Sequence, residues 1–163
     1  MAFDYFLDIE GIKGEAEDFA HREEMELLSW RWGASYTGQI ASGSDQRGKT
    51  HIKDLVVTKY IDRASPTLLQ RCCSGTESDK ATLTCRKAGM HGAPLEYLKI
   101  ELRKVLITSI DGGVAAPNEL GTETITLNFG KVRYTYTPQS DTGLGLAMVD
   151  FEWDIEMHRA MEG

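Results

Sequence analysis

The sequence predicts a mainly β domain whose long strands bend into a closed or nearly closed barrel, with one short helix beside it. Period-2 alternation of apolar and polar residues dominates the chain and is the pattern of half-buried strands. In two alternating runs the phase shifts in mid-course, at residues 102–105 and at Gly130. An extra residue at a glycine is typical of a β-bulge, and bulges bend strands into barrels.

The strands follow one another along the chain with polar loops between them. The first is predicted at Phe3–Ile9. Residues 15–28 are ambiguous, because Ala16, Phe19 and Ala20 fit a helical period while a strand at 24–34 competes with it. Further strands are predicted at residues 52–61, 81–87, 98–107, 125–136 and 149–157. Loops rich in Gly, Ser and Asp are predicted at residues 36–49, 111–121 and 138–145.

The predicted helix covers about residues 66–74. Ser65 is placed to cap its first turn, and Pro66 suits the first helical position. Gly75 suits the left-handed conformation that commonly ends a helix. These three residues together define a short helix that lies beside the barrel.

The last strand alternates most regularly. Its apolar face is predicted to consist of Val149, Phe151, Trp153, Ile155 and Met157. The other face holds Asp150, Glu152, Asp154 and Glu156. Same-face neighbours lie about 6.5–7 Å apart, between the two carboxylate spacings of glycoside hydrolases. Four carboxylates in regular register instead favour a solvated strand face, balanced by Lys131, Arg133 or a neighbouring subunit.

Length and charge limit the classes of function. The 163 residues suit one domain over 1–163. Eighteen basic against twenty-five acidic residues give a charge of −7, which disfavours nucleic acid. No apolar run has the roughly 20 residues of a membrane span. The start, Met1-Ala2-Phe3-Asp4, lacks the basic region of a secretory signal. We therefore expect folding in the cytosol, with any export independent of a cleaved signal.

The cysteines predict no disulfide and no metal site. Cys72 and Cys73 are adjacent, and bridging adjacent residues conflicts with disulfide geometry. With Cys85 and His91 they are the nearest candidates for metal ligands, but they lack the C-x₂-C spacing of zinc sites. Cys85 shares a strand face with Ala81 and Leu83, which predicts a small core residue.

One motif matches the phosphate-binding loop letter for letter. It is Gly43-Ser44-Asp45-Gln46-Arg47-Gly48-Lys49-Thr50. Such a loop needs a helix after it, so that backbone amides and the helix dipole converge on phosphate. Here the following residues are β-branched and predict a strand. With no nucleophile–base motif elsewhere, the sequence predicts no enzyme and no cofactor.

Two tryptophans flank an arginine in Trp30-Arg31-Trp32. On a strand the two indole rings share one face, and their size predicts core packing or an interface. Arg31 then lies on the opposite face and is expected to be exposed.

Several stretches together resemble the haemolysin-coregulated protein (Hcp) family, in the family's order and over nearly the whole chain. They are FLDIEGIKGE at residues 6–15, LSWRWG at 28–33, TKYIDRASP at 58–66, LTCRKAG at 83–89, LEYLKI at 95–100, LNF at 127–129, and the closing Trp153-Asp154. The resemblance implies an antiparallel β-barrel of two sheets with the short helix at its side.

The resemblance also implies a structural function in the bacterial type VI secretion system. Members form hexameric rings that stack into an inner tube, which a contractile sheath drives outward with its spike. The ring lumen carries and protects small effector proteins. The tube is assembled in the cytoplasm and secreted without a signal peptide. The implied partners are other copies of the chain, effectors, spike and sheath, with no nucleic acid and no membrane insertion.

Two predicted surfaces follow from the resemblance. Ser29 and Arg31 would face the lumen, where relatives often place a small hydroxyl residue at the position of Arg31, so acidic cargo is expected here. The loop at 36–49 would reach the adjacent ring. Its predicted stacking residues are Gln39, Ser44, Asp45, Gln46 and Arg47. Where many relatives have almost pure glycine, these charges predict salt-sensitive stacking. The alternative function is a monomeric β-barrel that binds a small ligand in its interior.

Overall fold

The computed structural model describes residues 3–40, 48–89, 92–139 and 146–160. The strand pairs in this part of the chain are antiparallel, as predicted. Its elements are, in order, β1 (Phe3–Ile9), β2 (Met25–Glu26), β3 (Ser29–Arg31), β4 (Ala34–Tyr36), β5 (Thr50–Ile52), β6 (Leu55–Tyr60), α1 (Ser65–Ser74), β7 (Ser78–Ala88), β8 (Pro94–Gly113), β9 (Thr122–Tyr136), β10 (Val149–Asp154) and β11 (Arg159–Ala160).

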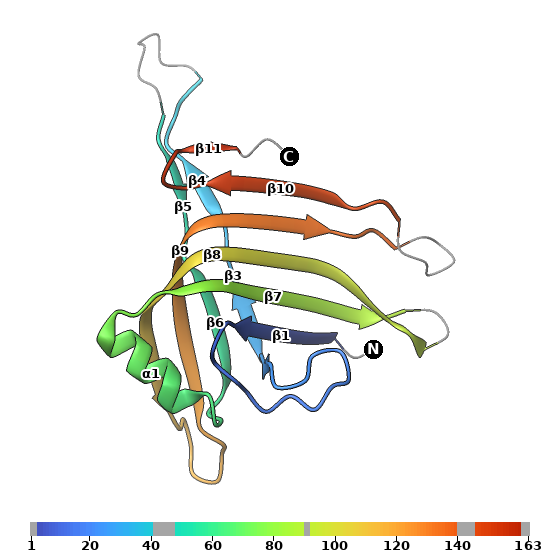
Figure 1. The fold of residues 1–163 in the computed structure, drawn as a ribbon, viewed down its shortest axis with the longest axis vertical. Coiled ribbons are helices and arrows are strands. Elements are labelled where there is room, and N and C mark those ends of the chain that lie inside the picture. Colours follow the sequence, from blue (N-terminus) through green and yellow to red (C-terminus); the bar gives the residue numbers. More distant parts are fainter. Residues whose placement is uncertain (1–2, 41–47, 90–91, 140–145, 161–163) are drawn as a thin grey trace.

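Two layers of strands share the long strands β8 and β9, which bend from one layer into the other (Figure 1). Residues 131–136 of β9 pair with β10, whereas residues 122–127 pair with β6. The first layer therefore runs β11-β10-β9-β8-β7-β1-β2, and the second is built on β3 and β6. The prediction of a mainly β fold with two sheets and one flanking helix is confirmed.

The bend lies where the sequence shifts phase, but its form differs from the predicted bulge. The pairs Arg103↔Lys131 and Val105↔Phe129 keep one register across it. Both strands take an extra residue at the same rung, Lys104 in β8 and Gly130 in β9, and Lys104 has φ 55°. The one-sided bulge predicted at Gly130 is therefore wrong. The register of β8 on β9 shifts further along, between residues 107 and 109.

The barrel is not closed by a continuous strand. The strand predicted at 24–34 is divided, because β2 pairs with β1 while β3 pairs with β6. Between them, Leu27 N donates to Tyr5 O at 2.8 Å and Leu28 N donates to Thr58 O at 2.7 Å. The chain thus changes its partner within two residues as it crosses from one layer to the other.

Two other predicted elements also differ from the structure. The strand predicted at 52–61 ends and restarts at Lys53 and Asp54, because β5 leaves the layer to pair with β4. The ambiguous segment is neither helix nor strand before Met25. Its backbone is held instead by bonds from Gly14 N to Glu23 O and from Ala16 N to Glu24 O.

The helix α1 ends as predicted and begins differently. Gly75 has φ 64°, the left-handed conformation expected past a helix. Ser65 is not the cap, because Ala64 occupies that position and Ser65 lies inside the helix. The carboxylate of Asp62 accepts the Ala64 N–H at 2.9 Å instead, and the Ser65 hydroxyl donates to Glu123 at 2.6 Å.

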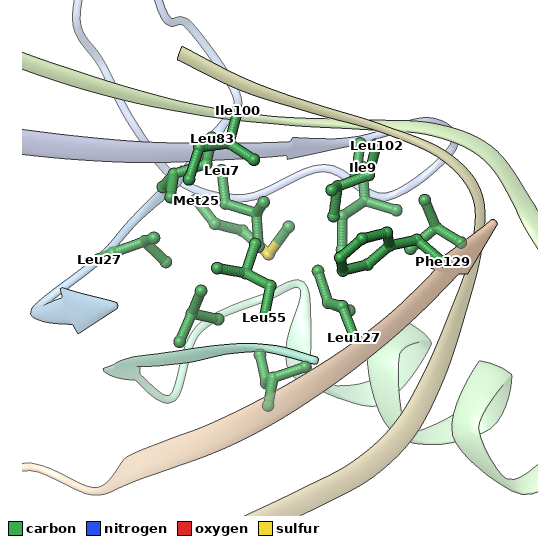
Figure 2. Packing of buried hydrophobic residues seen from close by; sticks show 14 of the residues in the cluster. Leu7, Ile9, Met25, Leu27, Leu55, Leu83, Ile100, Leu102, Leu127 and Phe129 are labelled. Carbon is green, nitrogen blue, oxygen red and sulfur yellow. The ribbon is translucent and has the colours of Figure 1, made fainter. Parts of the chain in front are cut away.

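The space between the layers is packed with aliphatic side chains, as Figure 2 shows. Leu7, Leu83 and Ile100 from the first layer meet Leu55 and Leu127 from the second, and all five are fully buried. Cys85 is fully buried as well, so its predicted place in the core is confirmed. Burial raises the pKa of its thiol to about 12, which suits a packing role.

A buried lysine joins the helix to the second layer. Lys59 has no exposed side-chain surface and lies 2.8 Å from an Asp62 oxygen and 2.7 Å from a Glu123 oxygen. Its Nζ also donates to Tyr60 O at 2.9 Å. Because Asp62 precedes α1 and Glu123 accepts from Ser65, this network ties β6, β9 and the helix together.

Candidate functional surfaces

The residues predicted to face a lumen lie on an exposed polar face of the second layer. Ser29 pairs with Thr58 and Thr58 with Thr124, which places these hydroxyl residues in one row across three strands. The Thr58 and Thr124 hydroxyls lie 3.3 Å apart. In the next row Arg31 pairs with Val56, which pairs with Thr126. We call Ser29, Arg31, Thr58, Thr124 and Thr126 the hydroxyl face.

Arg31 is exposed on this face, as predicted, and Ser29 is exposed beside it. In the described part of the chain, no ion pair involves Arg31. It borders a shallow surface hollow together with Lys53 and Asp54. The guanidinium is therefore available to a partner that approaches the hydroxyl face.

The tryptophans on either side of Arg31 turn the other way, as predicted. Trp30 and Trp32 are partly buried and pack against the core cluster. The indole N–H of Trp32 donates to Lys53 O at 2.8 Å, and its ring lies 5.8 Å from that of Tyr134. These contacts fix β3, and so they hold Arg31 on the opposite face.

The first layer carries an apolar face that the second layer does not cover. Three side chains at its β10 edge are exposed: Val149 by 66%, Tyr136 by 43% and Phe151 by 42%. We call Tyr136, Val149 and Phe151 the overhanging face. It adjoins Leu146 and Met148, which are 53% and 67% exposed. In Figure 1 the strand β10 lies at one margin of the layer, away from β6.

The overhanging face continues the core without a break. Val149 pairs with Tyr136, which pairs with the buried Leu98. Phe151 pairs with Tyr134, which pairs with the fully buried Ile100. Residues directly opposite one another on neighbouring strands point to the same face. Each row therefore begins in the core and ends at an uncovered margin.

The carboxylates of β10 are paired rather than arranged as a catalytic couple. Asp150 and Glu152 both contact Arg133, at 3.1 and 3.3 Å. The pairing predicted with Lys131 and Arg133 is confirmed. Asp154 does not belong to a solvated face, however, because its side chain is 9% exposed and accepts the Met157 N–H at 3.1 Å.

A hollow on the outside of the first layer gathers positive charge that no continuous run in the sequence indicates. Arg103, Lys104, Lys131 and Arg133 line it, and Glu101, Glu152 and Asp79 lie among them. These basic residues come from two strands about 30 positions apart, and only their pairing in β8 and β9 brings them together. The interleaved acidic residues distinguish the hollow from a purely basic surface.

The predicted stacking loop is described only in part. Ser44, Asp45, Gln46 and Arg47 lie outside the described residues. Gln39 lies beyond β4 on the hairpin formed by β4 and β5, which projects from one end of the molecule (Figure 1). On the same hairpin Tyr36 is 65% exposed and Ile40 is fully exposed.

The phosphate-loop motif leads into a strand. Thr50, its last residue, is the first residue of β5 and pairs with Tyr36. A helix N-terminus, which the phosphate site requires, is therefore missing at this position. In the described part of the chain no group of three or more His, Cys, Asp or Glu side chains is placed to hold a metal ion. No helix described there is both long and apolar enough to cross a bilayer.

Known proteins similar in sequence to this chain belong to the type VI secretion system. Residues 6–136 match the family model described as "Type VI secretion system effector, Hcp". Protein hcp1 of Pseudomonas aeruginosa is 39% identical over 160 residues, which cover 97% of this chain and 98% of that protein.

Solved structures show the same fold. The crystal structure of Hcp1 from Salmonella typhimurium is 33% identical with a TM-score of 0.79, and the match covers 99% of this chain and 100% of that one. A type six secretion system protein at 23% identity has a TM-score of 0.90, over 98% and 100% of the two chains. The chain belongs to the Hcp family of type VI secretion system proteins.

Proposed function

We propose that this chain is a structural subunit of the type VI secretion tube, that it forms stacked hexameric rings, and that it carries effector proteins in the ring lumen. The observation that supports this most strongly is the overhanging face, in which rows of core residues continue to an uncovered margin. Exposed apolar surfaces of this kind mark interaction sites, and obligate contacts between identical subunits resemble a core cut in half.

The overhanging face lies at one margin of the layer, and β1 and β2 lie at the other. A contact between different margins of identical subunits is heterologous, and such contacts generate rings when the rotation closes. We therefore assign the overhanging face to the contact between neighbouring subunits within a ring.

The hydroxyl face supports the proposed lumen. Its Ser and Thr side chains offer weak, adaptable hydrogen bonds. Beside them on the same face of β6 lie the half-buried Val56 and the exposed Tyr60. A surface of this kind can bind different cargo proteins without specificity for one sequence. Arg31, repeated around a ring, would add a preference for acidic cargo.

The hairpin formed by β4 and β5 supports the proposed stacking. It projects from the body of the molecule, and its exposed Tyr36 and Ile40 offer contacts to an adjacent ring. The stacking residues proposed on and beside it are Gln39, Ser44, Asp45, Gln46 and Arg47. In this proposal the residues of the phosphate-loop motif contact the adjacent ring and do not bind a nucleotide. The protein is then neither an enzyme nor dependent on a cofactor.

The remaining partners follow from the same proposal. The tube would contact the spike and the contractile sheath, and it would bind neither nucleic acid nor membrane. It would assemble in the cytoplasm and leave through the secretion system without a signal peptide. Detection of the unprocessed chain in the medium of secreting cells, and its retention in cells that lack the sheath, would test this location.

The apparent mass in solution tests the assembly. We expect a species of about six times 18.2 kDa, seen as rings by electron microscopy. A stable species of 18.2 kDa at all concentrations would exclude the ring. Co-expression with acidic effector proteins, followed by capture of the tagged ring, would then identify the cargo.

The alternative is a monomeric barrel with a small ligand in its interior. The packing between the layers gives it no support, because fully buried aliphatic side chains occupy that space (Figure 2). The hollow on the first layer is lined largely by charged residues, and the one beside Arg31 also includes Trp32, Val56 and Thr126. Both are open to solvent. The mass measurement separates the two functions, since the alternative requires a monomer.

A further inference from the structure

A histidine of the segment between β1 and β2 lies between two carboxylates. His21 Nδ1 is 2.5 Å from a Glu24 oxygen, and Nε2 is 2.7 Å from a Glu96 oxygen. The His21 side chain is 8% exposed, that of Glu24 15% and that of Glu96 38%. Glu96 belongs to β8, so these contacts connect distant parts of the chain. We call His21, Glu24 and Glu96 the histidine clasp.

Both contacts of the clasp require a proton between the nitrogen and the oxygen. A neutral imidazole has one N–H and one lone pair, whereas an imidazolium has two N–H groups. The clasp therefore closes with two protons shared among its three groups. If one is lost, a ring lone pair faces a carboxylate oxygen across a hydrogen-bond distance, and that contact becomes repulsive.

The surroundings of the clasp are polar but already paired. Phe6 stacks on the imidazole with centroids 4.4 Å apart, and the Arg86 guanidinium lies 4.9 Å from the Phe6 centroid. Arg86 binds Asp4 and Asp18, and its hydrogen bond holds the pKa of Asp18 at about 2.

Two more charged groups lie beside the carboxylates of the clasp. Lys99 Nζ is 3.8 Å from the second oxygen of Glu96. Burial raises the pKa of Glu24 most strongly, although contacts with His21 oppose this, and Asp8 and Glu96 raise it further. A lone carboxylate is thus disfavoured at Glu24 unless the imidazole beside it supplies a proton.

The clasp fastens a segment that has little other regular structure. Residues 13–24 are held to one another by the backbone bonds from Gly14 to Glu23 and from Ala16 to Glu24. His21 and Glu24 come from this segment, and Glu96 is their contact on β8. The opening of the clasp would remove this tie and leave the pair of Asp18 with Arg86 of β7 between the segment and the first layer.

We propose that the histidine clasp is a pH-sensitive fastening that holds residues 13–24 on the first layer when it contains two protons and weakens when one is lost. The proposal is independent of ring assembly, because every group in it belongs to one chain. It places the pH-responsive element where the segment between β1 and β2 reaches across the layer to Glu96 on β8.

The direction of the effect follows from the proton count. In an unfolded chain a histidine loses its second proton near about pH 6.5. The closed clasp needs two protons, one more than a neutral imidazole and two carboxylates hold, so its contribution to stability is fully present below about pH 6.5 and falls as the pH rises. For one proton, the folding equilibrium constant falls by at most about tenfold per pH unit.

The test is urea unfolding between about pH 6.5 and about pH 8.5 for the wild type, Glu96→Gln and Glu101→Gln. In E96Q the amide donates to the neutral ring while the other ring N–H donates to Glu24, so the clasp closes with one proton fewer. We expect the unfolding equilibrium of the wild type to shift with pH and that of E96Q to shift much less. E101Q changes a carboxylate on the same strand that pairs with Lys80 instead, and it should keep the slope of the wild type.

Two results would overturn the proposal: a wild-type stability that does not change over this range, or an E96Q slope equal to that of the wild type. The ¹⁵N shifts of the His21 ring provide a second measurement that does not depend on unfolding. In the closed clasp they should show both nitrogens protonated in the wild type and one protonated in E96Q. Equal ring shifts in the two proteins would likewise exclude the fastening.

Discussion

The overhanging face and the hydroxyl face share one bent strand, β9, but have opposite character. The overhanging face is apolar, and its rows lead out of the core to Val149 and Phe151. The hydroxyl face is polar, and its rows join Ser29, Thr58 and Thr124 on the outside of the second layer. An apolar face suits a permanent contact, whereas a polar face suits a cargo that must later be released. The strand β9 thus contributes to both kinds of surface.

A charge on the overhanging face should have the largest effect. We expect Val149→Asp to abolish assembly and leave a monomer of 18.2 kDa, because the carboxylate would be desolvated in an apolar contact. The side chain is 66% exposed in one subunit, so the fold should persist. Light scattering measures the mass, and circular dichroism checks the fold. Asp150→Asn, on the other face of the same strand, should still assemble, and loss of assembly there would remove the distinction between the faces.

The second prediction concerns the buried ion pairs of Lys59, which stabilise the second layer that carries the hydroxyl face. Lys59→Met leaves Asp62 and Glu123 without their buried cation, and it should lower the free energy of unfolding by about 3–5 kcal/mol. Urea unfolding gives this value. Lys53→Met, at an exposed position near by, should change it by less than about 0.5 kcal/mol. Equal effects of the two substitutions would mean that the buried network does not stabilise the second layer.

A substitution on the hydroxyl face should have a smaller effect, on the affinity for cargo. Arg31→Ser removes an exposed cation, worth up to about 1 kcal/mol for each contact with an acidic protein. We expect a roughly fivefold loss of affinity for acidic cargo and no change in ring formation. Binding to the purified ring by calorimetry measures the affinity. Unchanged retention in Arg31→Ser would exclude the proposed charge preference.

The smallest expected effect is on stacking. If Asp45 and Arg47 contribute charged contacts between rings, stacks should shorten as ionic strength rises above about 0.15 M, where charges are screened beyond about 8 Å. Sedimentation of assembled tubes at several salt concentrations measures the lengths. Stacks whose lengths do not change with salt would show that these charges are not used between rings.

Much of the fold could be predicted from the sequence because its determinants are local. Alternation indicates the strands, and β1 is predicted to the residue. Pro66 and Gly75 define α1 within one residue at its start and at its end. Local pattern could not predict where a strand changes partner. Residues 24–34 alternate adequately, yet β1 and β6 compete for them and divide them into separate strands.

The surfaces were harder to predict because they depend on what covers them. Val149 and Ile100 both occupy apolar positions in alternating strands, but Ile100 lies under the second layer and Val149 does not. Sequence has no local signal for this difference. His21 likewise has no pattern around it, because Glu96 lies 75 residues further along the chain. The exposure of Arg31 was predictable, because the tryptophans on either side of it pack against the core and place Arg31 on the opposite face.

The shared bend of β8 and β9 has a mechanical consequence. The two layers cannot separate without disruption of the β8–β9 ladder, which continues on both sides of Lys104 and Gly130 in one register. A load applied along these strands acts on many hydrogen bonds at once and not on one after another. The bend also keeps the angle between the layers fixed, since Gly130 O accepts the Ile155 N–H at 2.9 Å and ties the end of β10 to the corner. Such a subunit is expected to resist separation of its two layers under load.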